Sequence, residues 1–557
     1  MPKTADSVEK ENDHEKNSKE TEALERMVIK AKKIADVLRG FMGTVRIITH
    51  HDADGICSAA IITKSLARER KGFQLSFIKQ LYEDDVIGLE KEANKLVMFL
   101  DMGSGQLEII QKHLLNDDTK VIVIDHHKMQ GEIASDDLFH LNPVEFGIDE
   151  NISGSGTAYL VSRAINHDNK ELSQLAIIGA IGDSQVGSIG PNWGLFGLNK
   201  EILKDAESSG KIRVSKGLRL WGRTTRPIHK ALEYSVDPYI PGISSSESGA
   251  VHFLQELGIR LRSENGAWRT LSDLNRAEMK RLTTGIIKER IRENHDNPEW
   301  VFGEVYDLLD KEDFKDANEF ATILNSAGKQ NMGYVGIALC LNNKEYFPMV
   351  DKMLERYRKE IGKSLGWVEK HPEAVRRTQK ANYILAGNSI PETVISNVVS
   401  IIHRSEMLPE SEKDKPLFAL VDAEKGDVKV SARVSDHAVE SGLSLQELIS
   451  EAVEGLGGEG GGHAGAAGAS LPKGSEERFI NSIEVILMKQ PAKESDDNKV
   501  DLNGTAESEG RANGEPGEGT EIHRGEGTAQ SEQDGREVIL EPKKENEGKG
   551  LVRYLRA

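Results

Sequence analysis

Histidine and aspartate side chains end four apolar segments between residues 47 and 185. The first segment, IITHHDADG (47–55), places His50, Asp52 and Asp54 two residues apart on an extended stretch, so their side chains point to one side. Three such ligands, closed by a glycine at a helix start, suit a metal ion or a phosphate group. A loop whose aspartates cap a helix is the alternative, and this motif alone does not separate the two.

Three further segments end in the same residue types. Asp101 follows VMFL (97–100), where a carboxylate could also cap the next turn. The run VIVIDHH (121–127) adds two adjacent imidazoles, which metal sites use often, with a carboxylate orienting the ring. Asp183 ends IIGAIG (177–182), and a helix C-terminus is a poor place for a negative charge, which favours a ligand there.

The four segments together predict a metal site. Its candidate ligands are His50, Asp52, Asp54, Asp101, His126 and Asp183. Their oxygen and nitrogen donors suit two divalent cations bridged by a carboxylate, and the imidazoles favour Mn²⁺ over Mg²⁺.

An alternation of short β runs and helical patterns must position these residues. Strands are predicted at 45–49, 75–78, 96–100 and 121–124, and helices at 24–38, 56–68, 158–165 and 172–181. This alternation predicts an α/β domain with a parallel sheet covered on both faces. Such sheets bind ligands at the carboxyl ends of their strands, where the candidate ligands fall.

A second, smaller α/β unit is expected from 383 to 488, with strands at 417–421 and 428–434, a helix at 445–453 and a glycine-rich turn. Between the two units, the pattern predicts helices at 272–293 and 352–368 and a strand at 334–341. The predicted division is a disordered N-terminus (1–20), a first α/β domain (21–190), a middle region of connecting helices with a basic stretch (191–380), a second α/β domain (381–490) and a disordered acidic tail (491–557).

These segments resemble the motifs of the DHH phosphoesterase superfamily, which is named after the triplet Asp125-His126-His127. The runs HLNP (140–143) and SGSGT (153–157) fall where that superfamily has an Asn-Pro step and a helix-starting turn. The run GGGHAGAAG (460–468), after KVSAR (429–433), resembles the GGGH signature of the associated DHHA1 domain. Length and the segment GRTTRPIHK (222–230) resemble the archaeal RecJ-like nucleases, including the GINS-associated nuclease.

The resemblance covers about residues 40–260 and 320–490, and it implies a fold and a set of roles. A parallel-sheet DHH catalytic domain is expected to face a smaller α/β DHHA1 substrate-binding domain across a cleft. His50, Asp52 and Asp101 would hold one metal ion. Asp54, Asp101, His126 and Asp183 would hold the other. As catalytic residues, His127 would face the substrate phosphate and Asp125 would orient a histidine. Substrate phosphates would be bound by Arg433, Gly460, Gly461, Gly462 and His463.

Composition limits the class of protein. The chain has 557 residues, too many for one core, and its net charge of −19 argues at first sight against a nucleic-acid partner. Two cysteines exclude a disulfide-rich scaffold and a four-cysteine zinc finger. Without a long apolar stretch or a leader pattern, the sequence predicts no membrane span, no signal peptide and a cytoplasmic location.

The distribution of charge points the other way. Residues 211–232 contain seven Lys or Arg and no acid. A basic stretch of this kind can follow a phosphate backbone, so it favours a polynucleotide over a dinucleotide substrate, with Arg223 and Arg226 as further substrate ligands. A solvated helix face is the alternative, although such faces usually interleave acids.

The predicted function is a Mn²⁺- or Mg²⁺-dependent exonuclease, with two ions per active site, acting on single-stranded DNA and, as a second candidate, RNA. The resemblance implies 5′→3′ polarity, a role in DNA replication or repair and a GINS-type partner. Two alternatives remain: a phosphodiesterase for cyclic dinucleotides or short oligonucleotides, and a GINS-binding replication scaffold. Inorganic pyrophosphatase activity, also known in the superfamily, is disfavoured by the GGGH run and the length.

Overall fold

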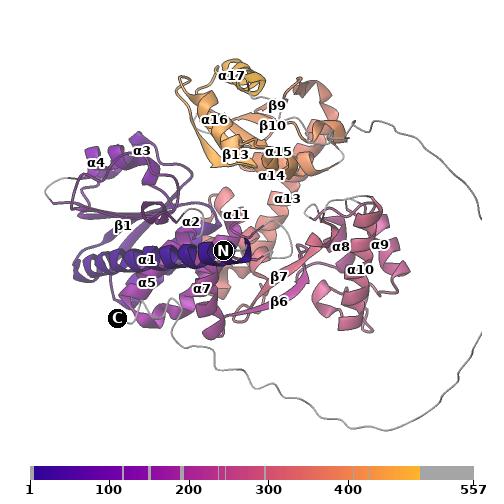
Figure 1. Cartoon of the computed structure of the whole chain (residues 1–557), viewed down its shortest axis with the longest axis horizontal. Coiled ribbons are helices and arrows are strands. Elements are labelled where there is room, and N and C mark those ends of the chain that lie inside the picture. The colour runs from indigo at the N-terminus through magenta and orange to yellow at the C-terminus, as the bar shows by residue number, and fades with distance from the viewer. Residues whose placement is uncertain are drawn as a thin grey trace, which may run out of the picture. The chain divides into compact units, whose positions relative to one another are not determined.

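A five-stranded parallel sheet forms the first domain of the computed structural model (Figure 1). The structure describes residues 5–489 apart from 116–117, 149–151, 188–193, 236–237, 245, 294–296, 406 and 424–425. The strand order is β2-β1-β3-β4-β5. Their bounds are β1 Val45–His50, β2 Phe73–Ile78, β3 Leu96–Leu100, β4 Lys120–Ile124 and β5 Leu138–Leu141. The parallel sheet and its first four strands confirm the α/β prediction, whereas β5 was not anticipated.

Helices cover both faces of this sheet, because the strand residues alternate between two separate cores. Ile47 and Met98 belong to the larger core, together with α1 Ala5–Gly40, α2 Ala53–Arg68, α5 Gly154–Ile165, α6 Ser173–Gly182 and α7 Gly197–Ser208. Ile48 and Phe99 belong to the other core, with α3 Glu83–Lys91 and α4 Leu107–Leu114. Burial on both faces explains why these strands read as continuous apolar runs. Figure 1 shows α3 and α4 on one side of the sheet and α1 and α5 on the other.

The N-terminal helix differs from expectation in length. The apolar pattern predicted a helix from Leu24 after a disordered segment 1–20, but α1 begins at Ala5 and ends, as expected, at Gly40. Its buried side chains from Leu24 onward pack in the larger core. The charged residues before Leu24 continue the same helix without an apolar face, which is why the pattern did not reveal them.

A helical group with its own core follows the first domain. In the sequence it falls between β6 Ile212–Leu218 and β7 Phe302–Leu308, which pair with each other as an antiparallel ladder. The group consists of α8 Ile228–Glu233, α9 Glu247–Glu256 and α10 Arg276–Arg292. Buried side chains such as Ile228, Leu254 and Leu282 form a cluster separate from the sheet cores. The sequence indicated only the helix at 272–293, which corresponds to α10.

One predicted strand is wrong. Residues 334–341 were expected to form a strand, yet α12 Gly333–Cys340 is a helix between α11 Ala317–Lys329 and α13 Phe347–Lys370. A short run that is apolar all round does not distinguish a strand from a buried helix. Packing against the rest of the protein favours the helical conformation of this run. The helix α12 contacts α2 closely, since a Cβ on Gly336 would lie 2.9 Å from Ile56 Cγ2.

The second α/β domain is built on a six-stranded mixed sheet of order β12-β13-β11-β10-β9-β8. Its strands are β8 Val375–Arg377, β9 Asn382–Gly387, β10 Leu417–Asp422, β11 Val428–Arg433, β12 Glu459–His463 and β13 Ala466–Leu471. Its helices are α14 Ile395–Arg404, α15 Asp436–Glu440, α16 Leu445–Val453 and α17 Glu476–Lys489. The glycine-rich run was expected to be a turn, but it is the edge strand β12, because its backbone pairs with β13 from Glu459 to His463.

Three further sequence predictions concern the cysteines, membrane-spanning segments and the C-terminal tail. Cys57 was expected in the core, and it is fully buried, as is nearly all of Cys340; both are free thiols. Among the described helices, none combines the length and the apolar character needed to cross a membrane. The predicted acidic tail, 491–557, lies outside the described residues.

Candidate metal centre

The six candidate ligands converge at the carboxyl edge of the parallel sheet. Three groups have ligand atoms that all lie within 4.8 Å of one another. The groups are His50, Asp52 and Asp101; Asp54, His126 and Asp183; and Asp101, His126 and His127. The first group has the residues of one ligand set that the superfamily resemblance implied, and the second has three of the four residues of the other set, without Asp101. Asp101 occurs in two of the three groups.

Asp101 occupies the centre of this arrangement. Its Oδ2 lies 3.4 Å from His50 Nδ1, and its Oδ1 lies 3.3 Å from His126 Nε2. His50 Nδ1 is also 3.1 Å from Asp52 Oδ2, and His126 Nε2 is 3.6 Å from Asp183 Oδ2. The two oxygens of one carboxylate therefore face one histidine from each ligand set, which is the geometry expected of a bridging ligand.

The polar atoms that point into this cluster lack hydrogen-bond partners. Both carboxylate oxygens of Asp101, Oδ2 of Asp54, Nδ1 of His50 and Nε2 of His126 are buried and unsatisfied. Buried polar atoms are normally paired, since an unsatisfied one costs about 1–3 kcal/mol. Five such atoms facing one another fit a site built for cations, with oxygen and imidazole donors that suit Mn²⁺ or Mg²⁺.

Backbone geometry supports the same interpretation. Asp101 adopts a positive φ of 57°, a left-handed conformation that costs a non-glycine residue on the order of 1–3 kcal/mol. Its N–H donates to Ile124 O at 2.8 Å, so the strand ladder holds this turn in place. Gly154 at the start of α5 makes room for the carboxylate, since a Cβ there would lie 2.6 Å from Asp101 Oδ1. This glycine belongs to the SGSGT run, which the sequence marked only as a helix-starting turn.

The electrostatics of the cluster favour bound cations. Burial, followed by the charges of Asp101 and Asp183, raises the pKa of Asp54 well above its usual value. Burial alone would lower the pKa of His126, but the neighbouring carboxylates outweigh it and raise the pKa. The raised pKa values favour the protonated forms of these side chains, and cations would compete with those protons for the same atoms.

Asp125 has a different role from the ligands. Its Oδ1 accepts from the His126 N–H at 2.7 Å and lies 2.8 Å from His127 Nδ1, while its Oδ2 accepts from the Ser104 N–H at 2.9 Å. Burial would raise the pKa of Asp125, but the His127 charge outweighs it, so the carboxylate stays ionised. The carboxylate thus fixes the turn after β4 and orients His127, whose side chain is 53% exposed.

Buried polar side chains reinforce that turn. Asn142 Nδ2 donates to His127 O at 2.9 Å and to Ser104 Oγ at 2.8 Å. Ser104 Oγ lies 2.9 Å from His140 Nε2, and His140 Nδ1 lies 2.7 Å from Glu145 Oε1. Through these contacts the HLNP run supports the turn that carries His126 and His127, a role that the sequence did not reveal for His140.

Three family models match segments of this chain. The DHH family N-terminal domain model matches residues 44–182, the DHH-CID domain model matches 220–299 and the DHHA1 domain model matches 381–489. An uncharacterized protein of Methanocaldococcus jannaschii is 31% identical over 467 residues, which cover 82% of this chain and 96% of the relative. The chain belongs to the DHH/DHHA1 superfamily.

Solved structures share parts of this fold. RecJ of Thermus thermophilus in complex with Mn²⁺ is 17% identical with a TM-score of 0.49, over 83% of this chain and 55% of that one. CDC45 of Entamoeba histolytica is 10% identical with a TM-score of 0.56, over 83% of this chain and 99% of that one. Membership of the DHH/DHHA1 superfamily makes the chain a hydrolase, and its DHH domain carries a fitting metal site.

The predicted phosphate ligands of the DHHA1 domain lie at two places on its sheet. Arg433 ends β11, and its Nε donates to Ser400 Oγ at 2.8 Å. Burial, then the charges of Arg433 and Lys429, lower the pKa of Lys329 to about 8, which places three cations close together. The exposed edge strand β12 carries Gly460, Gly461, Gly462 and His463. Phosphate binding by these residues stays a prediction.

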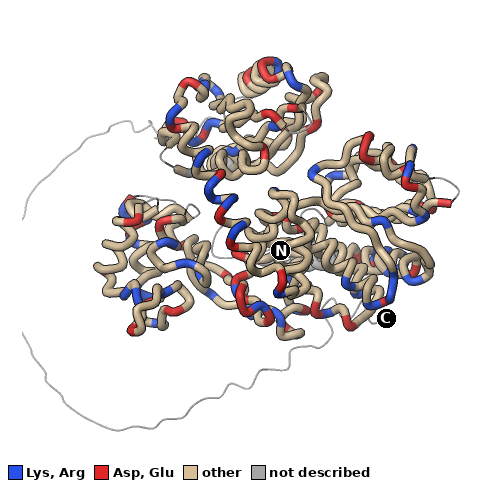
Figure 2. Tube along the Cα trace, turned by 180° about the vertical axis from the view of Figure 1, so that it is seen from behind, with Lys and Arg blue, Asp and Glu red and all other residues tan. Residues whose placement is uncertain are grey.

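The structure corrects the interpretation of the basic stretch 211–232. Acidic side chains of the same chain pair with five of its seven cations. Figure 2 shows that Lys and Arg alternate with Asp and Glu over much of the described chain. The Arg223 guanidinium contacts Asp307 and Asp316, with its Nε 2.9 Å from Asp316 Oδ2, so it is engaged within the fold, and its substrate role stays a prediction. Arg226 packs over the Trp221 ring at 4.3 Å, and its substrate role stays a prediction. The remaining ion pairs are Lys211–Asp310, Arg213–Asp307, Lys216–Glu304 and Lys230 with Glu233 and Glu247.

Gln185 is a site residue that sequence reasoning missed. Its Nε2 lies 3.2 Å from His126 Nδ1 and donates to Asp183 Oδ2 at 3.0 Å, so one amide contacts two ligands of the same set. Asn199 Nδ2 fixes this amide by donating to Gln185 Oε1 at 2.6 Å. The only signal in the sequence was its place two residues after Asp183.

Replacing Gln185 with leucine is therefore expected to weaken Mn²⁺ binding about 10- to 100-fold, because outer partners of metal ligands contribute on that scale. Isothermal titration calorimetry of the full chain measures this change directly. Gln174→Leu is the matched control, since Gln174 is also buried in the DHH domain but contacts Lys211 and Asp310 instead. Equal affinities for Q185L and wild type would contradict the positioning role.

Proposed function

We propose that the protein is a two-metal phosphodiesterase that shortens single-stranded nucleic acid from an end, with DNA as the first substrate and RNA as the second. The observation that carries this proposal is the position of Asp101, whose two unsatisfied oxygens face one histidine of each ligand set. The polarity 5′→3′, a role in replication or repair and a GINS-type partner rest on the family resemblance.

His50, Asp52 and Asp101 would hold one divalent ion, and Asp54, Asp101, His126 and Asp183 would hold the other. When bound, such a pair supplies an activated water and neutralises charge that develops on the phosphate. The chain's own contribution is to fix these side chains at the sheet edge, with Gln185 holding His126 and Asp183 in place.

His127 is the proposed proton donor. Burial would lower its pKa, but the Asp125 carboxylate outweighs this and raises it, which favours the imidazolium. With Nδ1 held against Asp125 at 2.8 Å, the opposite nitrogen is available to donate to a phosphate oxygen or to the leaving oxygen. Arg433 and the β12 residues Gly460–His463 are the proposed ligands for neighbouring phosphates.

A second candidate, a phosphodiesterase for cyclic dinucleotides or short oligonucleotides, gains from one observation. The basic stretch 211–232 favoured a long strand, and five of its seven cations turn out to be paired with acids of the same chain. The same metal centre would serve either substrate, so the structure of the centre does not separate them.

A time course on 5′- and 3′-labelled single-stranded DNA and RNA with Mn²⁺ tests the proposal. We expect progressive shortening from one end, and the label that is released first identifies the polarity. Turnover of dinucleotides without shortening of long strands would favour the second candidate. Absence of hydrolysis from all substrates, with Mn²⁺ bound, would contradict both.

Replacing His127 with glutamine is expected to lower kcat about 10²- to 10³-fold, the usual contribution of a general acid. Mn²⁺ affinity is expected to change little, because the His127 side chain is about half-exposed and its Nδ1 is held by Asp125 at 2.8 Å. Parallel kinetics and calorimetry measure the two quantities. A large loss of Mn²⁺ affinity in H127Q would instead identify His127 as a metal ligand.

A further inference from the structure

The helical group of the DHH-CID match carries a basic excess that the overall charge conceals. From Leu257 to Arg292 the chain has nine Lys or Arg and four Asp or Glu, in a protein of net charge −19. The acids of α10 are engaged locally: Glu278 pairs with Arg269 at 2.7 Å, and Glu289 pairs with Arg292. Within the described residues, no ion pair links Lys280 or Lys288 to a carboxylate. This part of the chain therefore presents uncompensated positive charge.

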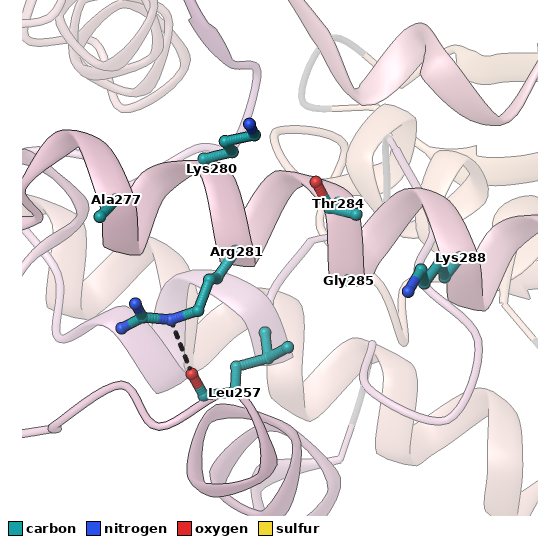
Figure 3. Close-up of a pocket in the computed structure, with 7 residues that line it drawn as sticks. All are labelled: Leu257, Ala277, Lys280, Arg281, Thr284, Gly285 and Lys288. Carbon is teal, nitrogen blue, oxygen red and sulfur yellow. Dashed lines mark hydrogen bonds between the residues drawn. The ribbon is translucent and has the colours of Figure 1, made fainter. Parts of the chain in front are cut away.

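The uncompensated charges lie along one face of α10. Lys280, Thr284 and Lys288 are four residues apart and exposed, and a helix rises about 6 Å over four residues. They line a pocket of about 460 Å³ together with Arg281, which donates to Leu257 O at 3.0 Å (Figure 3). We call this surface, made of Lys280, Arg281, Thr284 and Lys288, the α10 basic face.

We propose that the α10 basic face binds the sugar-phosphate backbone of single-stranded nucleic acid at a site separate from the metal centre. This inference deepens the proposed function, because it assigns a second contact that only a polynucleotide is long enough to use. Donors that recur about every 6 Å match successive phosphates of an extended strand, and two ammonium groups with a hydroxyl between them bind phosphate oxygens without reading bases.

An acidic protein partner fits this face less well. Interfaces between proteins depend on large buried anchors, often aromatic, that enter a pocket. Here the floor is formed by Leu257, Ala277 and Gly285, and it is surrounded by cations. The stretch 211–232 provides the contrast, because cations such as Lys211, Arg213 and Arg223 contact carboxylates of the same chain.

Salt-dependent binding tests the proposal. Each phosphate contact contributes about 0.7 to the slope of log affinity against log salt for single strands. Fluorescence anisotropy of labelled DNA and RNA of about 30 nucleotides, in EDTA to prevent hydrolysis, is expected to show this slope reduced by about 1.4 in the K280A/K288A double variant. Affinity at about 0.1 M salt is expected to fall roughly tenfold.

The matched control is K112A/K204A, which removes two exposed lysines that pair with Glu83 and Glu201 in the DHH domain. Its slope is expected to equal that of wild type. A K280R/K288R variant keeps the charge and should retain binding. Loss confined to DNA or to RNA identifies which strand the face takes. An unchanged slope in K280A/K288A, or equal loss of binding to polyglutamate, would overturn the proposal.

Because the binding assay contains no metal and needs no turnover, its result is independent of catalysis. A chain that binds strands through α10 but hydrolyses nothing would contradict the proposed function and leave this inference standing. If wild type and K280A/K288A hydrolyse long strands at equal rates, and the salt dependence of strand binding is the same in both, this inference would be contradicted and the proposed function would stand.

Discussion

Replacing Asp101 with asparagine is expected to abolish Mn²⁺-dependent hydrolysis, with kcat/KM reduced at least about 10³-fold, or about 4 kcal/mol of transition-state stabilisation. Asp101 is 2% exposed, and each of its oxygens faces a histidine of a different ligand set without any other partner. An asparagine keeps the shape but supplies one oxygen and a neutral NH₂ group. It can therefore serve only one of the two ligand sets, and it removes the shared negative charge.

The D101N variant also tests whether Asp101 binds two metal ions or only one. Calorimetry of wild type is expected to show two Mn²⁺ ions per chain, and D101N is expected to lose at least one of them. Asp118→Asn is the matched control, because Asp118 is an exposed aspartate of the same domain that pairs with Lys95 on the surface. Two ions bound by D101N with wild-type affinity would show that Asp101 does not bridge them.

The candidate metal centre was predictable because three of its ligands lie at the ends of strands. His50, Asp101 and His126 each end an apolar run, and parallel strands bring such ends to one edge of a sheet. Asp52 caps α2 by accepting from the Gly55 N–H at 3.0 Å, and Asp54 lies in the first turn of that helix, so residues 50–54 are not the extended stretch that the sequence predicted. The local sequence pattern was nevertheless sufficient to identify the carboxyl edge of the parallel sheet as the place where these residues meet.

The sequence did not reveal features that depend on contacts between residues far apart in the chain. The local sequence does not show the ion pairs of Arg223, because its partners Asp307 and Asp316 lie 84 and 93 residues further along the chain. Gln185 has an unremarkable sequence context, and only the fold brings it to His126, 59 residues away. The helix α12 was mistaken for a strand because its short apolar run has no period of its own, and its close packing on α2 decides its conformation.

Substitutions of buried residues usually destabilise a protein, but a substitution in the metal centre is expected to stabilise the metal-free form. Replacing Asp54 with asparagine is expected to raise the thermal midpoint of the metal-free protein by about 2–4 °C, which corresponds to about 1 kcal/mol in a domain of this size. Asp54 is 1% exposed, and burial together with Asp101 and Asp183 raises its pKa, so its ionised form is unfavourable there. An asparagine can still accept the Ser155 N–H bond, now 3.1 Å from Asp54 Oδ1, and carries no charge.

Adding Mn²⁺ is expected to invert this order. A ligand at 100 times its dissociation constant stabilises the native state by about 2.7 kcal/mol, and the variant forfeits part of that gain because it has lost a charged ligand. Differential scanning calorimetry in EDTA and in excess Mn²⁺ compares the two states. If D54N were less stable than wild type in both conditions, Asp54 would be a structural residue. A crossover between the conditions would mean that the native chain accepts electrostatic repulsion at this edge of the sheet in order to bind cations, which is the property that a hydrolytic metal centre requires.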